Sequence, residues 1–220
     1  MNLYNEKSKQ YFSNVRYDLI KLLPNLKLNS VLEVGAGGGD TILKIKEMGL
    51  SQKVTGIELM EIDGSNQKNK EIDRFIFGNI ETDSFDLEEK SFDVIICGDV
   101  LEHLIEPWKT VQKLSGLLKK DGILIISCPN IRHYTGLFKI FLKGDFTYTK
   151  EGLFDRTHFR FFCKKNLKEL AESGGLKVTT ITPLFKLVEV NKSYIVNLFT
   201  LGLLEQFFAL QYVIVASKED

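Results

Sequence analysis

Short hydrophobic runs alternate with amphipathic segments along most of the chain, and this alternation predicts strands separated by helices. The run Phe92–Cys97 is largely apolar, which is typical of a strand that is covered on both faces. We expect strands at Val31–Val34, Lys53–Glu58, Arg74–Phe77, Phe92–Cys97, Ile123–Ser127, Leu176–Ile181 and Tyr212–Ala216.

The segments between these strands carry hydrophobic residues at helical spacing. Proline and glycine mark where several of the helices begin or end. We expect a helix over 11–22, with Tyr11, Val15, Leu19 and Leu22 on one face and Pro24 after it, and a second helix over Thr41–Met48 before Gly49. A third should begin at Pro107 and carry Trp108, Val111, Leu114 and Leu118 on one side. A fourth is expected around Leu167, Leu170 and Ala171, before Gly174.

Strands that alternate with helices imply right-handed crossovers and a mostly parallel sheet, so the fold class is α/β. We interpret residues 1–220 as one domain. Ligands of such sheets bind at the carboxyl ends of the strands, so the ends of the first four strands should converge on one crevice. Residues 130–163 are too long for a simple crossover, and we expect them to form an insertion that acts as a partial lid.

The composition narrows the class of partner. The 220 residues carry 29 basic and 29 acidic side chains, and no basic block stands out. That balance argues against a nucleic-acid backbone as the main partner. The cysteines Cys97, Cys128 and Cys163 are odd in number, and two of them lie in strand-like runs. We therefore expect buried thiols in a reducing compartment.

We expect a cytoplasmic protein without a cleavable signal, because Met1–Gln10 is polar and holds both signs of charge. The stretch Tyr194–Ala216 is apolar enough to suggest a membrane span. However, Asn197, Glu205 and Gln211 lie within it and would make a spanning helix costly. A helix followed by the last strand accounts better for this stretch.

The first strand stops in a glycine-rich turn, Gly35–Gly39. Glycines adopt backbone angles that other residues avoid, and they leave no side chain between the main chain and a ligand. Because a helix is expected to follow, the turn would present N–H groups to an electron-rich ligand. The dinucleotide fingerprint Gly-x-Gly-x-x-Gly/Ala fits at Gly35 and Gly37 but fails at Asp40.

Glu33 and the glycines at alternate positions after it match the pattern Glu-x-Gly-x-Gly-x-Gly. This pattern resembles the first motif of class I S-adenosylmethionine-dependent methyltransferases. The resemblance implies a Rossmann-like, seven-stranded sheet with helices on both faces and an antiparallel last strand, with 1–25 as an N-terminal cap helix. It also implies that S-adenosylmethionine binds as the cofactor and leaves as S-adenosylhomocysteine.

The same resemblance implies which residues hold the methionine end of the cofactor. Gly35, Gly37 and Glu33 would lie against it, and Arg16 would meet its carboxylate. Further cofactor contacts are expected from Ala36, Leu59, Gly98, Asp99 and Val100.

The nucleoside end is expected at the second and third strands. Glu58 would accept hydrogen bonds from both ribose hydroxyls, and the adenine would lie against Asn79 and Ile80. The family usually carries aspartate where this chain has Asn79, whose amide oxygen can also accept a hydrogen bond.

Four further segments resemble a bacterial methyltransferase subgroup that is often found with glycosyltransferases in cell-surface polysaccharide gene sets. They are Asp99–Leu104, Pro107-Trp108, Ser127–Asn130 and Asp155–Phe162. The resemblance implies a small-molecule or saccharide acceptor, methylated at a hydroxyl oxygen.

Methyl transfer to a hydroxyl needs a group that takes the proton, and a histidine of near-neutral pKa suits that role. His158 and His103 are the catalytic candidates, with a structural role open for each, while His133 is left without a role. Glu102 beside His103 does not amount to a metal site, because adjacent residues rarely share a cation and no further ligands cluster in the sequence. We therefore expect no metal.

Two features of the insertion stay open. Arg156 and Arg160 could pair with an anion on the acceptor or with Asp155 or Glu151. The run Leu137–Leu142 favours core packing, with an acceptor wall or a membrane-touching patch as the alternatives.

Three other functions compete with a methyltransferase of small acceptors. A nicotinamide-dependent oxidoreductase is disfavoured by Asp40 in the fingerprint. A non-catalytic binding protein that partners a glycosyltransferase is disfavoured by the intact glycine motif and Glu58. Methylation of a membrane lipid, with contact at the membrane periphery, is suggested by Phe138 and Phe141. The sequence carries no signal for the oligomeric state.

Overall fold

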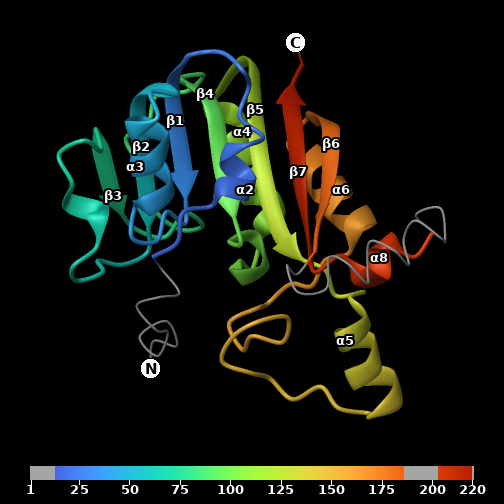
Figure 1. The fold of residues 1–220 in the computed structure, drawn as a ribbon. Coiled ribbons are helices and arrows are strands. Elements are labelled where there is room, and N and C mark those ends of the chain that lie inside the picture. Colours follow the sequence, from blue (N-terminus) through green and yellow to red (C-terminus); the bar gives the residue numbers. More distant parts are fainter. Residues whose placement is uncertain (1–12, 186–202, 220) are drawn as a thin grey trace.

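The computed structural model describes residues 13–185 and 203–219. Its centre is a seven-stranded sheet with the strand order β3-β2-β1-β4-β5-β7-β6 (Figure 1). The strands are β1 Leu28–Val34, β2 Ser51–Glu58, β3 Arg74–Phe77, β4 Phe92–Gly98, β5 Leu118–Pro129, β6 Leu176–Leu184 and β7 Gln211–Lys218.

The strand directions follow the expected α/β pattern. Strands β1 to β5 pair in parallel, and β7 runs antiparallel to both β5 and β6. The predicted strands, the mostly parallel sheet and the antiparallel last strand are all confirmed.

Helices cover both faces of the sheet, as predicted (Figure 1). Side chains alternate in direction along a strand, so Val31 packs into one hydrophobic cluster and its neighbour Leu32 into the other. The first cluster includes Ile42 of α3, and the second includes Val111 of α4 and Leu167 of α6. The α-helices are α2 Tyr17–Ile20, α3 Asp40–Glu47, α4 Pro107–Leu117, α5 Tyr134–Leu137, α6 Lys164–Glu172 and α8 Glu205–Phe208. The described residues also form two 3-10 turns, η2 Asn66–Lys68 and η3 Leu101–His103, and one π-helical turn, η4 Phe138–Leu142.

Helix α4 begins with Pro107 in its first turn, as expected, and buries Val111 and Leu114 completely. Trp108, which we expected on the same side of the helix, is not buried with them. Trp108 is 40% exposed, and the guanidinium of Arg160 lies 5.7 Å from the centre of its ring. The cation and the indole face attract each other, which accounts for a tryptophan at the surface of this helix.

The N-terminal helix is shorter than predicted. Tyr11 lies outside the described residues, and within residues 13–27 only Tyr17–Ile20 is α-helical. Arg16 has a non-helical backbone, and its N–H donates to the hydroxyl of Thr41 at 3.2 Å. This contact with α3 replaces the hydrogen bond that a longer helix would have made, so tertiary structure overrides the helical pattern.

The insertion 130–163 lies beyond the carboxyl ends of β4 and β5 (Figure 1). The prediction that Leu137–Leu142 packs in the core is wrong, because Phe141 and Leu142 are 77% and 74% exposed.

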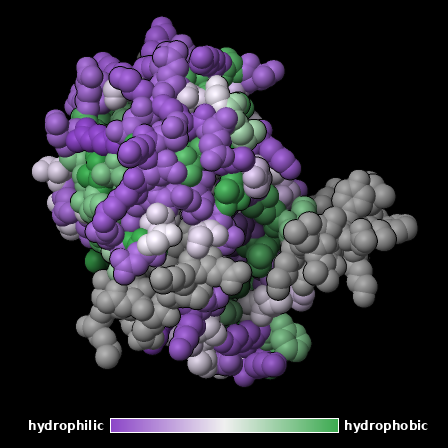
Figure 2. Space-filling model, turned by 60° about the vertical axis from the view of Figure 1, so that its left-hand side comes forward, coloured by the Kyte–Doolittle hydropathy of each residue, from purple (hydrophilic) through white to green (hydrophobic). Residues whose placement is uncertain are grey.

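On the face seen in Figure 2, hydrophilic side chains cover most of the surface and hydrophobic ones show in a smaller area.

The predicted helix before β7 falls partly on residues 194–202, which lie outside the described residues. In the described part, only the four residues of α8 are helical there. No helix within residues 13–185 and 203–219 has both the length and the apolar character that crossing a membrane requires. Cys97 and Cys128 are buried free thiols, as expected from their place in strands.

Candidate active site

A cavity of about 480 Å³ opens at the carboxyl ends of β1, β2 and β4. The chain leaves β1 toward β2 and β3 and then returns to β4 on the other side of β1, so the cavity lies where the strand order reverses. Its volume is in the range of small-molecule sites. The predicted site residues that line it are Arg16, Glu33, Gly35, Ala36, Gly37, Glu58, Leu59, Asn79, Ile80, Gly98, Asp99, Val100 and His103.

The glycine turn passes close to the loop after β4. Gly35 has φ +70°, and a Cβ built there would lie 2.2 Å from Cγ2 of Val100. No larger residue fits this approach without moving Val100. The turn is fastened to β2 by hydrogen bonds from Gly35 N and Ala36 N to the carbonyl of Ile57, at 2.9 and 3.0 Å. The main chain therefore forms a fixed wall of the cavity.

Glu58 ends β2 with its carboxylate beside this turn. Its Oε2 accepts a hydrogen bond from Gly37 N at 2.8 Å, and its Oε1 accepts one from Leu59 N at 2.7 Å. Burial raises the pKa of Glu58, and the two N–H donors offset part of that effect. Because both donors hold the carboxylate in place, its remaining lone pairs have a fixed orientation at the cavity wall.

Glu33 lies at the base of the cavity and is almost completely buried. Its Oε2 makes no hydrogen bond, and its carboxylate accepts hydrogen bonds from the Thr41 side chain and the Ile42 N–H. Burial raises the pKa of Glu33 to about 8, although nearby Arg16 acts in the opposite direction. A buried oxygen without a partner is costly unless a ligand or water satisfies it, and a cationic ligand beside it would lower the raised pKa and favour the ionised carboxylate.

Arg16 and Asp99 join the N-terminal segment to the loop after β4. Nη1 of Arg16 lies 2.6 Å from Oδ2 of Asp99, and its Nε and Nη2 contact Asp18. Burial opposes the charge of Arg16, but the two aspartates together raise its pKa. Asp99 also accepts from the hydroxyl of Ser127 and has φ +55°, a backbone conformation that aspartate tolerates.

The adenine end of the expected site is partly built from internal hydrogen bonds. Asn79 N donates to Oδ2 of Asp83 at 2.9 Å, and Oδ1 of Asn79 accepts from Glu81 N at 2.9 Å. The amide oxygen of Asn79 is therefore already used once, and a ligand would need its second lone pair. Ile80 is buried and lines the same part of the cavity.

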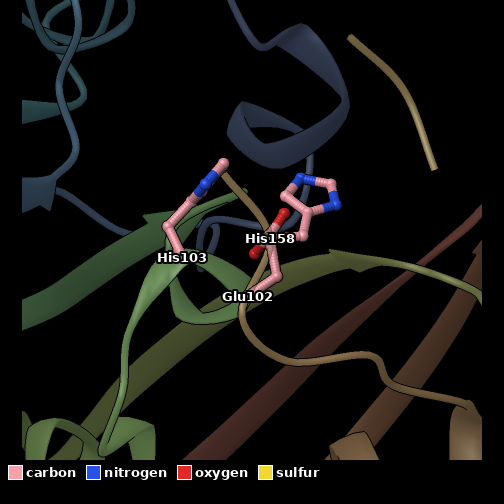
Figure 3. Close-up of side chains that lie close together, drawn as sticks. All are labelled: Glu102, His103 and His158. Carbon is pink, nitrogen blue, oxygen red and sulfur yellow. The ribbon is translucent and has the colours of Figure 1, made fainter. Parts of the chain in front are cut away.

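The two candidate histidines come together at the far end of the cavity. His103 lines the cavity, whereas His158 does not and is 8% exposed. Their ring centres are 4.7 Å apart in an edge-on arrangement. Figure 3 shows the carboxylate of Glu102 between the two rings. No third ligand stands beside Glu102 and His103 in the sequence, but the fold brings His158 to them from a distant part of the chain.

Sequence reasoning missed part of the cavity wall. Leu104, Ile105 and Phe159 form an apolar rim next to His103. Phe159 lies in the Asp155–Phe162 motif, and this motif could have pointed to Phe159 as a residue of the site. The insertion therefore reaches the cavity with one side chain, while its action as a lid stays a prediction.

His133 and the two arginines of the insertion lie outside the cavity wall. His133 is buried, and its Nδ1 lies 2.8 Å from the hydroxyl of Thr135. Arg160 donates from Nη2 to the carbonyl of Ile105, which holds the insertion against the loop after β4. The carboxylate of Asp155 accepts from the backbone and hydroxyl of Thr157.

Comparison with known proteins gives one family for this chain. A family model described as a methyltransferase domain matches residues 7–181. The ubiquinone biosynthesis O-methyltransferase of Coxiella burnetii (strain RSA 493 / Nine Mile phase I) is 27% identical over 171 residues, which are 76% of this chain and 72% of that protein.

Solved structures show the same fold. A SAM dependent methyltransferase from Archaeoglobus fulgidus gives a TM-score of 0.67 at 17% identity, covering 96% of this chain and 95% of that chain. Phosphoethanolamine N-methyltransferase 2 of Haemonchus contortus, solved with S-adenosyl-L-methionine, gives 0.63 at 15% identity, covering 93% of this chain and 52% of that chain.

The matched range 7–181 contains the glycine turn, Glu58, the loop after β4 and Phe159. It therefore spans every element that builds the cavity, and it covers well over half of the chain. The motif, the cavity at the strand-order reversal and the family model agree with one another. The chain belongs to the methyltransferase domain family, and it is an S-adenosylmethionine-dependent methyltransferase.

Proposed function

We propose that this protein transfers the methyl group of S-adenosylmethionine to a hydroxyl oxygen of a small or carbohydrate-linked acceptor. The observation that carries the proposal is the lining of one cavity. The glycine turn, Glu58, Asn79 and the loop Gly98–Val100 come from four strand ends, and all of them line it together with His103.

The cavity offers a separate partner for each part of the cofactor. Glu33 and the glycine turn are assigned to the methionine end, where a buried carboxylate would attract the ammonium group. Glu58 is assigned to the ribose and Ile80 with Asn79 to the adenine. Arg16 is assigned to the carboxylate of the cofactor, for which its contacts with Asp18 and Asp99 would have to be shared.

The acceptor is assigned to the end of the cavity at His103. Leu104, Ile105 and Phe159 form an apolar rim there, and His158 packs edge-on behind His103. Methyl transfer disperses the positive charge of the sulfonium, so alignment of the two reactants in a partly dehydrated pocket does most of the work, supplying up to roughly 7–11 kcal/mol. We assign His103 and His158 to the acceptor hydroxyl. His103 would contact the hydroxyl, and His158 would hold the ring of His103 in position.

Oxygen as the methylated atom is supported by the names of the relatives. Several proteins that match this chain, from Coxiella burnetii, Glaesserella parasuis and Homo sapiens, are named ubiquinone biosynthesis O-methyltransferases. The first two are 27% and 36% identical to this chain over their aligned parts. At this level of sequence identity we extend to this chain only the reaction type in these names, methyl transfer to oxygen.

A transfer assay tests the proposal. The purified chain is incubated with S-adenosylmethionine labelled in its methyl group and a panel of saccharides, nucleotide sugars and phenols. We expect label in at least one hydroxyl acceptor, and no label with the corresponding deoxy compound. Normal cofactor binding with no transfer to any of them would instead favour a non-catalytic protein, such as a partner of a glycosyltransferase.

A second candidate, methylation of a lipid acceptor, is favoured by the surface of the insertion. Phe138, Phe141 and Leu142 are all at least half exposed; Lys139 lies between Phe138 and Phe141, and Lys143 follows Leu142. Exposed apolar residues with interspersed lysines are typical of segments that lie on a membrane surface. Flotation with anionic liposomes would support this acceptor class if Phe141→Ser abolished it, and failure of the native chain to float would exclude it.

A further inference from the structure

We propose that Glu102, His103 and His158 bind one divalent transition-metal ion of the Zn²⁺ type at the edge of the cofactor cavity. One ligand atom from each of these residues lies within 4.8 Å of the others. The separation is small enough for a single ion to draw all three atoms into its coordination sphere through small side-chain rotations.

Backbone hydrogen bonds hold the two contributing segments together. Phe159 N and Arg160 N both donate to the carbonyl of Glu102, at 2.8 and 3.0 Å. Nη2 of Arg160 donates to the carbonyl of Ile105. The irregular stretch around His158 is therefore fixed against η3, and the cluster is part of the folded framework rather than a chance meeting of surface side chains.

The imidazoles are arranged as metal ligands commonly are. Nδ1 of His103 lies 3.0 Å from the carbonyl of Thr157, and Nδ1 of His158 lies 3.3 Å from the carbonyl of Leu153. A carbonyl oxygen only accepts, so each Nδ1 carries the proton in these contacts. That tautomer puts the lone pair on Nε2, and a metal-bound histidine typically donates its other ring N–H in this way.

Glu102 supplies the independent observation that a ligand belongs here. Its side chain is 2% exposed, and Oε1 makes no hydrogen bond, while Oε2 is contacted by Sγ of Cys128 at 3.4 Å. Buried carboxylates normally have every oxygen satisfied by protein, water or an ion. Figure 3 shows this carboxylate directed between the two rings.

The ligand set selects the class of ion. Mg²⁺ and Ca²⁺ prefer oxygen ligands throughout, whereas two imidazoles favour Zn²⁺ and its neighbours in the first transition row. Two histidines and one carboxylate leave a coordination position open for a further ligand, as in catalytic zinc sites.

The position of the cluster gives the open coordination site a role, and this part rests on the proposed function. His103 lines the cavity next to the apolar rim, so an ion on its ring would meet an acceptor hydroxyl there. A bound cation lowers the pKa of such a hydroxyl. The proton leaves to solvent, the oxygen forms a bond to the methyl carbon, and the bond from that carbon to sulfur breaks to leave a neutral thioether.

The test is a binding measurement that needs neither cofactor nor acceptor. The full chain, purified without a histidine tag and treated with a chelator, is titrated with Zn²⁺ by calorimetry and with Co²⁺ by visible absorption. We expect one ion per chain. Glu102→Gln and His158→Gln should each weaken Zn²⁺ binding by at least about tenfold. His133→Gln, which changes a buried histidine outside the cluster, should bind Zn²⁺ like the native chain.

Each outcome decides the proposal. Retained S-adenosylhomocysteine affinity in the variants shows that they fold, and His158→Gln carries the test alone if Glu102→Gln does not fold. The proposal is overturned if the native chain takes up no stoichiometric Zn²⁺ or Co²⁺, or if the cluster variants bind as well as the native chain. Equal loss in His133→Gln would also overturn it. Loss of metal binding with normal cofactor binding would leave the proposed function standing.

Discussion

The Oε2 atom of Glu58 accepts a hydrogen bond of 2.8 Å from the main-chain nitrogen of Gly37. This contact ties the end of β2 to the turn after β1, across the point at which the cavity opens. The carboxylate is held on one side by the turn and presents its other side to a ligand. The same residue thus orders the turn and, in the proposed function, would accept hydrogen bonds from the two ribose hydroxyls.

Replacing Glu58 by alanine is expected to weaken S-adenosylhomocysteine binding. A charged acceptor is worth about 1.5–3 kcal/mol, or roughly ten- to 150-fold in affinity. Calorimetric titration measures the change, and thermal unfolding checks the fold. Glu61→Ala is the matched control, because Glu61 is exposed and pairs only with Lys68 in the described contacts. Unchanged affinity in a folded Glu58→Ala protein would remove Glu58 from the cofactor site.

Replacing Gly35 by alanine is expected to lower the free energy of unfolding and to abolish cofactor binding. The new Cβ would lie 2.2 Å from Cγ2 of Val100, and φ +70° adds strain of about 1–2 kcal/mol to an overpacking cost of about 1–3 kcal/mol. Gly116→Ala is the control, because a Cβ in α4 meets nothing within 4 Å, and it should stabilise by about 0.5–1 kcal/mol.

A double variant separates the two causes at Gly35. Val100→Ala removes the atom that Cβ would strike, so it should recover the overpacking part but not the strain. Chemical denaturation of the single and double variants measures both parts. Equal stability of Gly35→Ala and the native chain would show that the turn tolerates a side chain and is not the fixed wall described above.

The cofactor end of the site could be predicted from the sequence, because its residues lie at the ends of strands. Glu33, Glu58 and Asn79 lie at the carboxyl ends of β1, β2 and β3, and parallel pairing brings these ends to one edge. Local pattern and sheet topology therefore suffice to place them in one cavity. The glycine turn adds its own signal, since few other residues fit where Gly35 meets Val100.

The acceptor end could not be placed in this way. His158 reaches Glu102 through a long insertion whose path no periodicity encodes, and only the backbone bonds from Phe159 and Arg160 show the meeting. The run Leu137–Leu142 would be equally apolar in a core or on a surface, so its composition does not predict the exposure that the structure shows. The predicted length of the N-terminal helix was wrong because Arg16 contacts Thr41 and Asp99, which are remote from it in the sequence.

The buried carboxylate of Glu33 makes stability depend on pH. Burial raises its pKa from an ordinary value of 4.5 to about 8, so between these values the folded protein holds a proton that the unfolded chain has lost. Stability should therefore fall as pH rises from about 4.5 to about 8, by up to about 1.4 kcal/mol per pH unit. The stability of Glu33→Gln relative to the native chain should rise over the same window. Parallel pH profiles of the two proteins in urea unfolding would contradict this.

Phe159 is expected to serve the acceptor and not the cofactor. It comes from the insertion and lines the cavity next to His103. Phe159→Ala should raise the KM for the acceptor by about tenfold, or ~1.4 kcal/mol, and leave S-adenosylhomocysteine affinity unchanged. Phe141→Ala, on the exposed part of the insertion, should change neither quantity for a water-soluble acceptor. A drop in cofactor affinity with Phe159→Ala would place the acceptor elsewhere.

Calorimetric titration of the purified chain with S-adenosylhomocysteine and, separately, with NADH tests the central claim most directly. The cavity formed by the glycine turn and Glu58 should take up one S-adenosylhomocysteine per chain, with saturable heat that Glu58→Ala strongly reduces, and NADH should give none. Saturable binding of NADH, or no heat with S-adenosylhomocysteine at millimolar concentration, would contradict the account.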